Sequence, residues 1–126
     1  MRKPKNIMPQ QTRILNERLS ELGITVPTDY RLFVTKTNRG RHSRNNKNVT
    51  VPLWAYEAGK LGYRKHDGDP EYAIYYASHE LAHIATPNQS HGPAFMTEFK
   101  RICPEHLWKY EILYKPRNAM AAGISL

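Results

Sequence analysis

The sequence predicts an α+β domain in which a small antiparallel β-hairpin packs on a central helix that is flanked by further helices. Apolar residues recur at helical spacing in four segments, whereas two short segments in the first half of the chain alternate apolar and polar residues. With 126 residues the chain is long enough to bury one hydrophobic core but short for two. We therefore expect a single domain over residues 10–115, between a flexible basic tail at 1–9 and a loose C-terminal tail at 116–126.

The first predicted helix covers residues 10–22. Thr12 has a side chain suited to an N-cap, and Gly23 is a typical helix stop. The apolar positions between them follow the helical repeat and are Ile14, Leu15, Leu19 and Leu22. This segment therefore has both end signals and one face that can be buried.

Two strands are predicted at residues 30–37 and 48–54, because β-branched and aromatic residues alternate there with polar ones. The polar segment between them would join the strands as an antiparallel hairpin. The tip of this hairpin would carry four basic residues, which are Arg39, Arg41, Arg44 and Lys47. Residues 55–69 contain three glycines and are expected to form a loop with at most a short helical turn.

The central helix has the clearest signals in the chain. Asp69 suits the N-cap position, and Pro70 suits the first helical position, where its missing N–H costs nothing. The pair Thr86-Pro87 should end the helix, because the residue before a proline disfavours the α conformation. The apolar stripe that should face the core consists of Ile74, Ala77, Leu81 and Ile84.

Two more helices are expected after the central one. The first covers residues 92–103, begins near Pro93 and would bury Phe95, Phe99 and Ile102. Pro104 should break it, and the final helix would cover residues 105–114.

The central helix also contains His79-Glu80-Leu81-Ala82-His83, which matches the motif H-E-x-x-H. Residues four apart share a helical face, so His79 and His83 can bind one Zn²⁺ at about 2.0–2.1 Å each. Glu80 lies about 100° around the helix from His79, so it flanks the metal. From there it can take a proton from a zinc-bound water, whose pKa the metal lowers to about 7. The spacing therefore predicts metal-assisted hydrolysis with Glu80 as the general base.

A catalytic zinc needs a third protein ligand and an open fourth position. His91 is the leading candidate, because it follows His83 closely and the segment "TPNQS" between them allows the chain to turn back. Glu98, Glu105 and His106 are alternatives. A carboxylate on the following helix is the third ligand in another large group of zinc peptidases, so Glu98 is the main competitor.

The sequence "HELAH" followed by "HGPAF" resembles the SprT-like (Spartan-type) zinc metallopeptidases, in which a short linker separates H-E-x-x-H from a helix that starts H-G-P-x-F. The resemblance is specific over residues 74–102 and extends loosely to the upstream helix and hairpin. It implies a minimal zincin fold in which His79, His83 and His91 bind zinc. It also implies that Glu80 is the general base of peptide-bond hydrolysis.

The positive charge is concentrated in the first part of the chain. Residues 1–47 contain eleven Lys and Arg against three Asp and Glu, whereas residues 48–126 contain eight of each. The whole net charge of +8 therefore lies in residues 1–47. This basic segment, which includes the hairpin tip, is either a binding surface for nucleic acid or a solvated surface that aids solubility.

Two functions compete on these grounds. The first is a zinc metallopeptidase that binds a protein or peptide substrate along the edge strand of the hairpin. Its substrates would include proteins associated with nucleic acid. The second is a basic nucleic-acid-binding module whose zinc site is structural or vestigial. Glu80 favours the first, because a purely structural histidine site has no use for that carboxylate.

Composition also indicates a compartment. The single cysteine, Cys103, excludes an intramolecular disulfide framework and a cysteine-based zinc ribbon. No apolar run approaches the roughly 18 residues of a membrane span, and the basic N-terminal stretch lacks the apolar segment of a secretory signal. We therefore expect a cytoplasmic protein that does not bind membranes.

Four further side chains stand near the motif or are of a type that binds metals. Tyr76 and Tyr72 precede His79 by one and two turns, and they either line the cleft and stabilise an oxyanion or pack against the neighbouring helix, which is the favoured interpretation. His42 and His66 lie in predicted polar loops without a partner pattern, so no role is expected for them.

Overall fold

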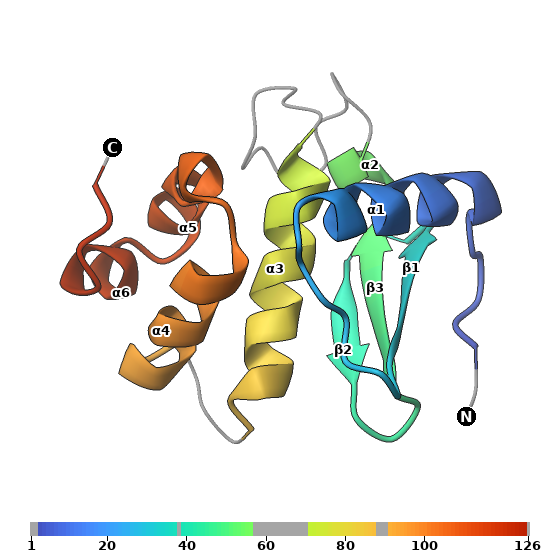
Figure 1. Cartoon of the computed structure of the whole chain (residues 1–126), viewed down its shortest axis with the longest axis horizontal. Coiled ribbons are helices and arrows are strands. Elements are labelled where there is room, and N and C mark those ends of the chain that lie inside the picture. The colour runs from blue at the N-terminus through green and yellow to red at the C-terminus, as the bar shows by residue number, and fades with distance from the viewer. Residues whose placement is uncertain (1–2, 38, 57–70, 88–90, 126) are drawn as a thin grey trace.

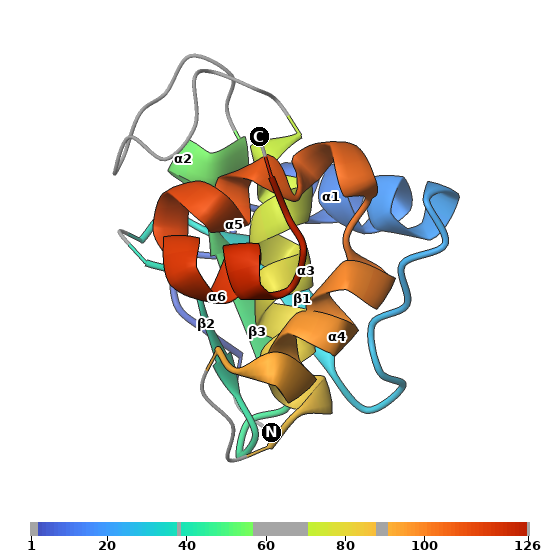
Figure 2. The same cartoon turned by 90° about the vertical axis from the view of Figure 1, so that its left-hand side faces the viewer.

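The computed structural model describes residues 3–37, 39–56, 71–87 and 91–125. In chain order its elements are α1 (Pro9–Glu21), β1 (Arg31–Thr35), β2 (Arg41–Ser43), β3 (Asn48–Pro52), α2 (Leu53–Tyr56), α3 (Tyr72–Ala85), α4 (Pro93–Ile102), a short 3₁₀ helix (Glu105–Leu107), α5 (Lys109–Tyr114) and α6 (Pro116–Ala121). Figure 1 shows α3 in the middle, with the sheet and α1 on one side and α4, α5 and α6 on the other. In Figure 2, which is turned by 90°, α4, α5 and α6 face the viewer and lie in front of α3. The expected α+β class is confirmed.

The sheet is mixed, with strand order β1-β3-β2. The expected antiparallel pairing of the two predicted strands is wrong, because β1 and β3 are parallel, with Val34 opposite Val51. The antiparallel partner of β3 is β2, which lies in the segment that we expected to be a loop. Two of the basic residues that were expected at a hairpin tip therefore lie elsewhere, since Arg41 belongs to β2 and Arg39 precedes it.

The edge of the sheet at β1 is covered by α1 and by the segment before it. The Thr12 Oγ1 accepts a hydrogen bond from the Val34 N–H at 2.9 Å, so Thr12 binds β1, and the N-cap of α1 is Met8. Residue Ile7 forms an antiparallel bridge with Thr35, and the Met8 N–H donates to the Val34 carbonyl at 2.8 Å. The last residues of the expected flexible tail are therefore paired with β1, and α1 itself begins at Pro9.

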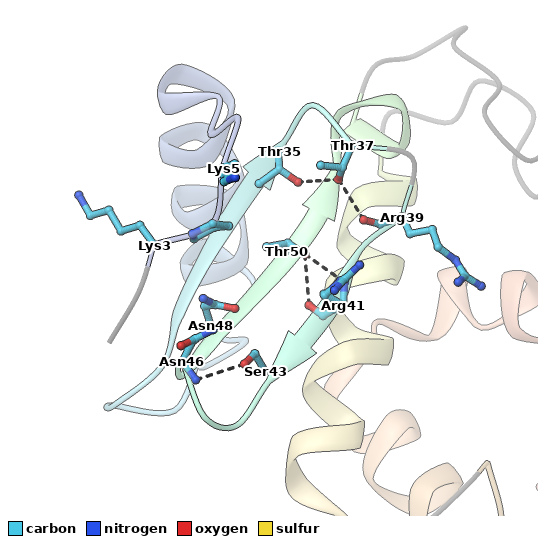
Figure 3. Close-up of a pocket in the computed structure, with 11 residues that line it drawn as sticks. Lys3, Lys5, Thr35, Thr37, Arg39, Arg41, Ser43, Asn46, Asn48 and Thr50 are labelled. Atoms are coloured by element: carbon cyan, nitrogen blue, oxygen red, sulfur yellow. Dashed lines mark hydrogen bonds between the residues drawn. The ribbon is translucent and has the colours of Figure 1, made fainter.

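Alternation along the strands separates the two faces of the sheet. Leu32, Val34, Val49 and Val51 belong to the hydrophobic core and are at most 3% exposed. The residues of β3 that alternate with these valines, and two of the three residues of β2, are mostly polar and lie on the other face, as expected for strands with one face on the core. The outer face consequently carries polar and charged side chains (Figure 3).

The helix α3 is buried on nearly all sides, because it lies between the sheet and the C-terminal helices (Figure 1). The predicted apolar stripe is confirmed at Ile74, Ala77 and Leu81, which are buried, while Ile84 is partly buried. The helix ends at Ala85 with Thr86 as its C-cap, as predicted. The expected N-terminal signals Asp69 and Pro70 lie outside the described residues, as does His66.

The C-terminal part of the chain differs from the prediction. The helix α4 begins at Pro93 as expected, and it buries Phe95 and Phe99. The final helix predicted at 105–114 is divided into the 3₁₀ helix and α5, and the expected loose tail contains α6. Ala119 and Ile124 are buried there, which holds this segment on the core. In the described part of the chain, no helix combines the length and hydrophobicity that crossing a membrane requires.

Candidate metal centre

Three histidine side chains converge between α3 and the start of α4. His79 and His83 lie one turn apart on α3, and His91 directly precedes Gly92, the N-cap of α4. The Nε2 atom of His91 lies 3.0 Å from Nε2 of His79 and 3.2 Å from Nε2 of His83. A tetrahedral ion with Zn–N bonds of about 2.0–2.1 Å holds two nitrogens about 3.3–3.4 Å apart. The three histidines are therefore close enough to bind a metal ion, with all three ligand atoms within 4.8 Å of one another.

The protonation states of these histidines suit metal binding. Burial lowers the pKa of His83 to about 4 and also lowers the pKa of His91, so both imidazoles are neutral at neutral pH. Neutral imidazole is the form that binds metals. A proton on the His91 Nε2 can form a hydrogen bond to the Nε2 of His79 or of His83, but not to both. A cation between the rings can accept a lone pair from all three nitrogens.

Glu111 fixes the orientation of the first histidine. It lies on α5 and is 0% exposed, and its Oε1 is 2.8 Å from the His79 Nδ1 and 2.8 Å from the Tyr75 hydroxyl. Burial by itself raises the pKa of Glu111, but the hydrogen bonds from His79 and Tyr75 outweigh it and leave the net pKa below the usual value. The carboxylate therefore accepts the Nδ1 proton, which leaves the His79 Nε2 lone pair for a metal.

The same carboxylate makes the site attractive to a cation. Its second oxygen, Oε2, is buried without a hydrogen-bond partner in the described part of the chain. A buried negative charge of this kind is costly unless positive charge lies close to it. Glu111 was not predicted, although it follows Leu107 by four residues in the helix expected at 105–114, where the two would share a face.

Glu80 lies beside the three histidines but is not part of the cluster with metal-ligand geometry. Its Oε1 lies 2.8 Å from the Nδ1 of His42, and its side chain is 12% exposed. The His42 ring stacks on His83, with 5.2 Å between centroids and 19° between planes. His42 therefore lies in β2 beside the histidine cluster, and not in a polar loop without a partner as expected. It was missed because β2 was not recognised, since Arg41-His42-Ser43 are all polar and show no alternation of apolar and polar residues.

The alternative ligands are not part of this cluster. The carboxylate of Glu98 is bound by Arg101 on the same helix at 2.7 Å. The Nε2 of His106 lies 2.8 Å from the Glu71 Oε1, and Glu105 is exposed. Among the described residues, the cluster found with metal-ligand geometry is that of His79, His83 and His91.

The chain was also compared with known proteins. No protein-family model, curated protein or solved structure matches it. The interpretation of the centre therefore depends on its own donor atoms and on the spacing of the motif.

The tyrosines on α3 pack in the core. Tyr72 is 3% exposed and lies edge-on to Tyr110, with centroids 4.9 Å apart. The Tyr76 hydroxyl accepts a hydrogen bond from the Gly40 N–H at 2.8 Å, and burial raises the pKa of Tyr76 to about 12. The packing interpretation is therefore confirmed for Tyr72, and Tyr76 joins α3 to the start of β2. Tyr114, which the sequence analysis did not single out, lies against the rings of His79 and His91.

The ligand set leads to a first prediction. His91→Ala is expected to reduce bound zinc from near one equivalent to a small fraction, because two imidazoles replace three. Glu98→Ala should keep the zinc content of the parent, since Glu98 pairs with Arg101 instead. Elemental analysis of purified protein, after zinc loading and removal of excess metal, measures both. Equal zinc content in the His91→Ala protein and the parent would contradict this ligand set.

A second prediction concerns Glu111. Glu111→Gln should weaken zinc affinity by roughly 10- to 100-fold, because it removes the charge that orients His79 and increases its basicity. Titration against a chelating zinc indicator gives the affinity, and the denaturation midpoint is recorded for each variant. The control is Glu105→Gln, which removes the same charge from an exposed position. An unchanged affinity in Glu111→Gln would show that this carboxylate does not support the ligand.

Proposed function

We propose that this chain is a zinc-dependent metallopeptidase of minimal zincin architecture, similar to the SprT-like domains. The observation that carries the proposal is the convergence of three histidines with Glu80, which is adjacent but outside the cluster. A structural site would have no need of a carboxylate in that position. Three protein ligands leave the fourth position of a tetrahedral ion for the reaction.

Zinc is the proposed metal because three imidazole nitrogens with tetrahedral spacing suit it, and the ion would act as a Lewis acid that polarises the scissile carbonyl and acidifies water. Glu80 is the proposed general base, which takes a proton from the attacking water and passes it to the leaving amine. His42 holds the Glu80 carboxylate in place through its Nδ1. His42 thus acts as a positioning residue.

The substrate would bind along β2. This strand is the edge of the sheet opposite to β1, and no described strand pairs with its outer side. Its residue His42 reaches the metal centre, so a peptide added to this edge would run beside the histidines. An extended peptide that adds to a sheet edge gains main-chain hydrogen bonds without regard to its sequence.

The alternative function is a nucleic-acid-binding module with a structural or vestigial zinc site. It is favoured by the net charge of +8 in residues 1–47. Two of the basic residues named for it have partners within the chain. Arg44 donates to the carbonyl of His83 at 2.7 Å, and Lys47 lies 3.5 Å from the carboxylate of Asp29.

The test of the peptidase is the third prediction. In zinc-loaded protein, Glu80→Gln should lower the rate of peptide hydrolysis by about 10²–10⁴-fold, because it removes general-base catalysis but keeps the ligands. Cleavage of an unfolded protein substrate is followed by mass spectrometry, with zinc content measured in parallel. Glu98→Gln is the control and should retain the parental rate. Full activity in Glu80→Gln with bound zinc would refute the mechanism.

A fourth prediction isolates the role of His42. His42→Ala should lower kcat by roughly 10- to 100-fold with zinc content unchanged, because the Glu80 carboxylate loses its partner. His106→Ala serves as control, since His106 is exposed and pairs with Glu71 away from the cluster. Steady-state rates are measured on a peptide that spans a cleavage site identified in the previous experiment. A parental kcat in His42→Ala would exclude a positioning role.

A further inference from the structure

The outer face of the sheet is hollowed into a groove that faces away from α3. Figure 3 shows the groove floor on β3, with Lys3 and Arg39 extending on opposite sides of it. Its volume is about 580 Å³, within the roughly 300–1,000 Å³ typical of ligand sites. This groove is lined by residues of the N-terminal segment, of all three strands and of the connections between them.

Strand alternation creates this groove. On β2 the side chain of His42 points to the metal centre, while its neighbours Arg41 and Ser43 line the groove. On β3 the groove is lined by Asn48 and Thr50, whereas the alternating Val49 and Val51 face the core. Polar side chains from two strands are thus collected on the face of the sheet that is opposite to His42.

The charge of the groove has one sign. Its lining contains four cations, Lys3, Lys5, Arg39 and Arg41, and no carboxylate. All four side chains belong to exposed residues, and the ion pairs found in the described part of the chain include none of them. This distinguishes them from Arg44 and Lys47, which have partners within the chain. Four unneutralised cations around one hollow attract an anion with several charges.

Hydrogen bonds within the protein order the polar residues that line the groove. The hydroxyls of Thr35 and Thr37 lie 2.8 Å apart, and Thr37 donates to the Arg39 carbonyl at 3.0 Å. The Arg41 N–H donates to the Thr50 hydroxyl at 3.0 Å. These bonds hold the backbone that carries both arginines, so this backbone needs little further ordering on binding.

We propose that this groove binds the phosphodiester backbone of a nucleic acid. Phosphates supply regularly spaced negative charges that suit cations on both sides of a channel. None of the lining residues is aromatic, so bases would not stack there and binding should not depend on sequence. The rim also lacks the large apolar side chains with which a protein inserts into a lipid surface.

The groove and the metal centre lie on opposite faces of the same strand. Because Arg41 and His42 are consecutive, a nucleic acid in the groove would lie across β2 from a peptide at the centre. The inference does not rest on the proposed peptidase, because no residue of the groove lining belongs to the histidine cluster. If both proposals hold, the groove would bring the centre to proteins bound on nucleic acid.

The fifth prediction tests the groove by fluorescence anisotropy with labelled oligonucleotides of about 20 nucleotides, as single strands and as duplexes. Arg39→Gln with Arg41→Gln should weaken binding at least tenfold at about 100 mM salt, and should reduce the slope of log affinity against log salt by about 1.4–1.8. The matched control is Lys109→Gln with Arg117→Gln, which removes the same charge from exposed positions on α5 and α6. The control should change the affinity less than about twofold. Denaturation midpoints show that both variants remain folded.

The outcomes separate the alternatives. The proposal is supported if the parent binds single strands or duplexes and only Arg39→Gln with Arg41→Gln loses this binding. The form that binds more tightly identifies the ligand. Equal losses in both double variants would show that binding depends only on the total charge of the protein, which would refute the proposal. The absence of binding by the parent protein at low salt would also refute it. Displacement of the oligonucleotide by polyglutamate of equal charge would show that phosphate is not recognised. The His91→Ala protein should bind as the parent does, so failure of the peptidase proposal would leave this result unaffected.

Discussion

The hydrogen bond between Glu111 and His79 is the interaction on which the geometry of the centre depends. It joins α5 to α3 across 32 residues of sequence and places the proton on the His79 Nδ1, so that Nε2 points to the other imidazoles. A buried carboxylate is costly unless hydrogen-bonded, and Glu111 accepts from both His79 and Tyr75. Any shift of α5 would break these bonds in a buried site, which keeps the C-terminal helices aligned with the three histidines.

The sheet is fixed to the opposite side of the same helix. Glu80 pairs with His42, and Tyr76 accepts a hydrogen bond from the Gly40 N–H, so β2 and the residue that precedes it are both bound to α3. A Cβ atom at Gly40 would collide with the Thr50 carbonyl and the Tyr76 ring, which explains why glycine stands at this close approach. His79, His83 and the proposed base Glu80 therefore all lie on one helix, which contacts both layers.

Elements with strong local signals were predicted well, and the others were not. The apolar repeat and the proline at residue 93 indicated α1, α3 and α4 to within a few residues, because spacing and end signals are properties of neighbouring residues. The predicted topology of the sheet was wrong because β2 was not recognised. This strand has only three residues, of which Arg41 and Ser43 face the groove and His42 faces the histidine cluster. No apolar alternation marks such a strand. The helix α6 was missed because only Ala119 and Ile124 are buried in the last segment.

The sequence by itself determined which histidines can meet. His79, His83 and His91 lie within thirteen residues, and the helical repeat fixes the first two on one face with Glu80 beside them. Only the tertiary structure decided what supports these side chains. His42 and Glu111 are separated from their partners by 38 and 32 residues, and no local pattern records such a meeting. It arises from the packing of β2 and α5 against the two sides of α3, which the whole core determines together.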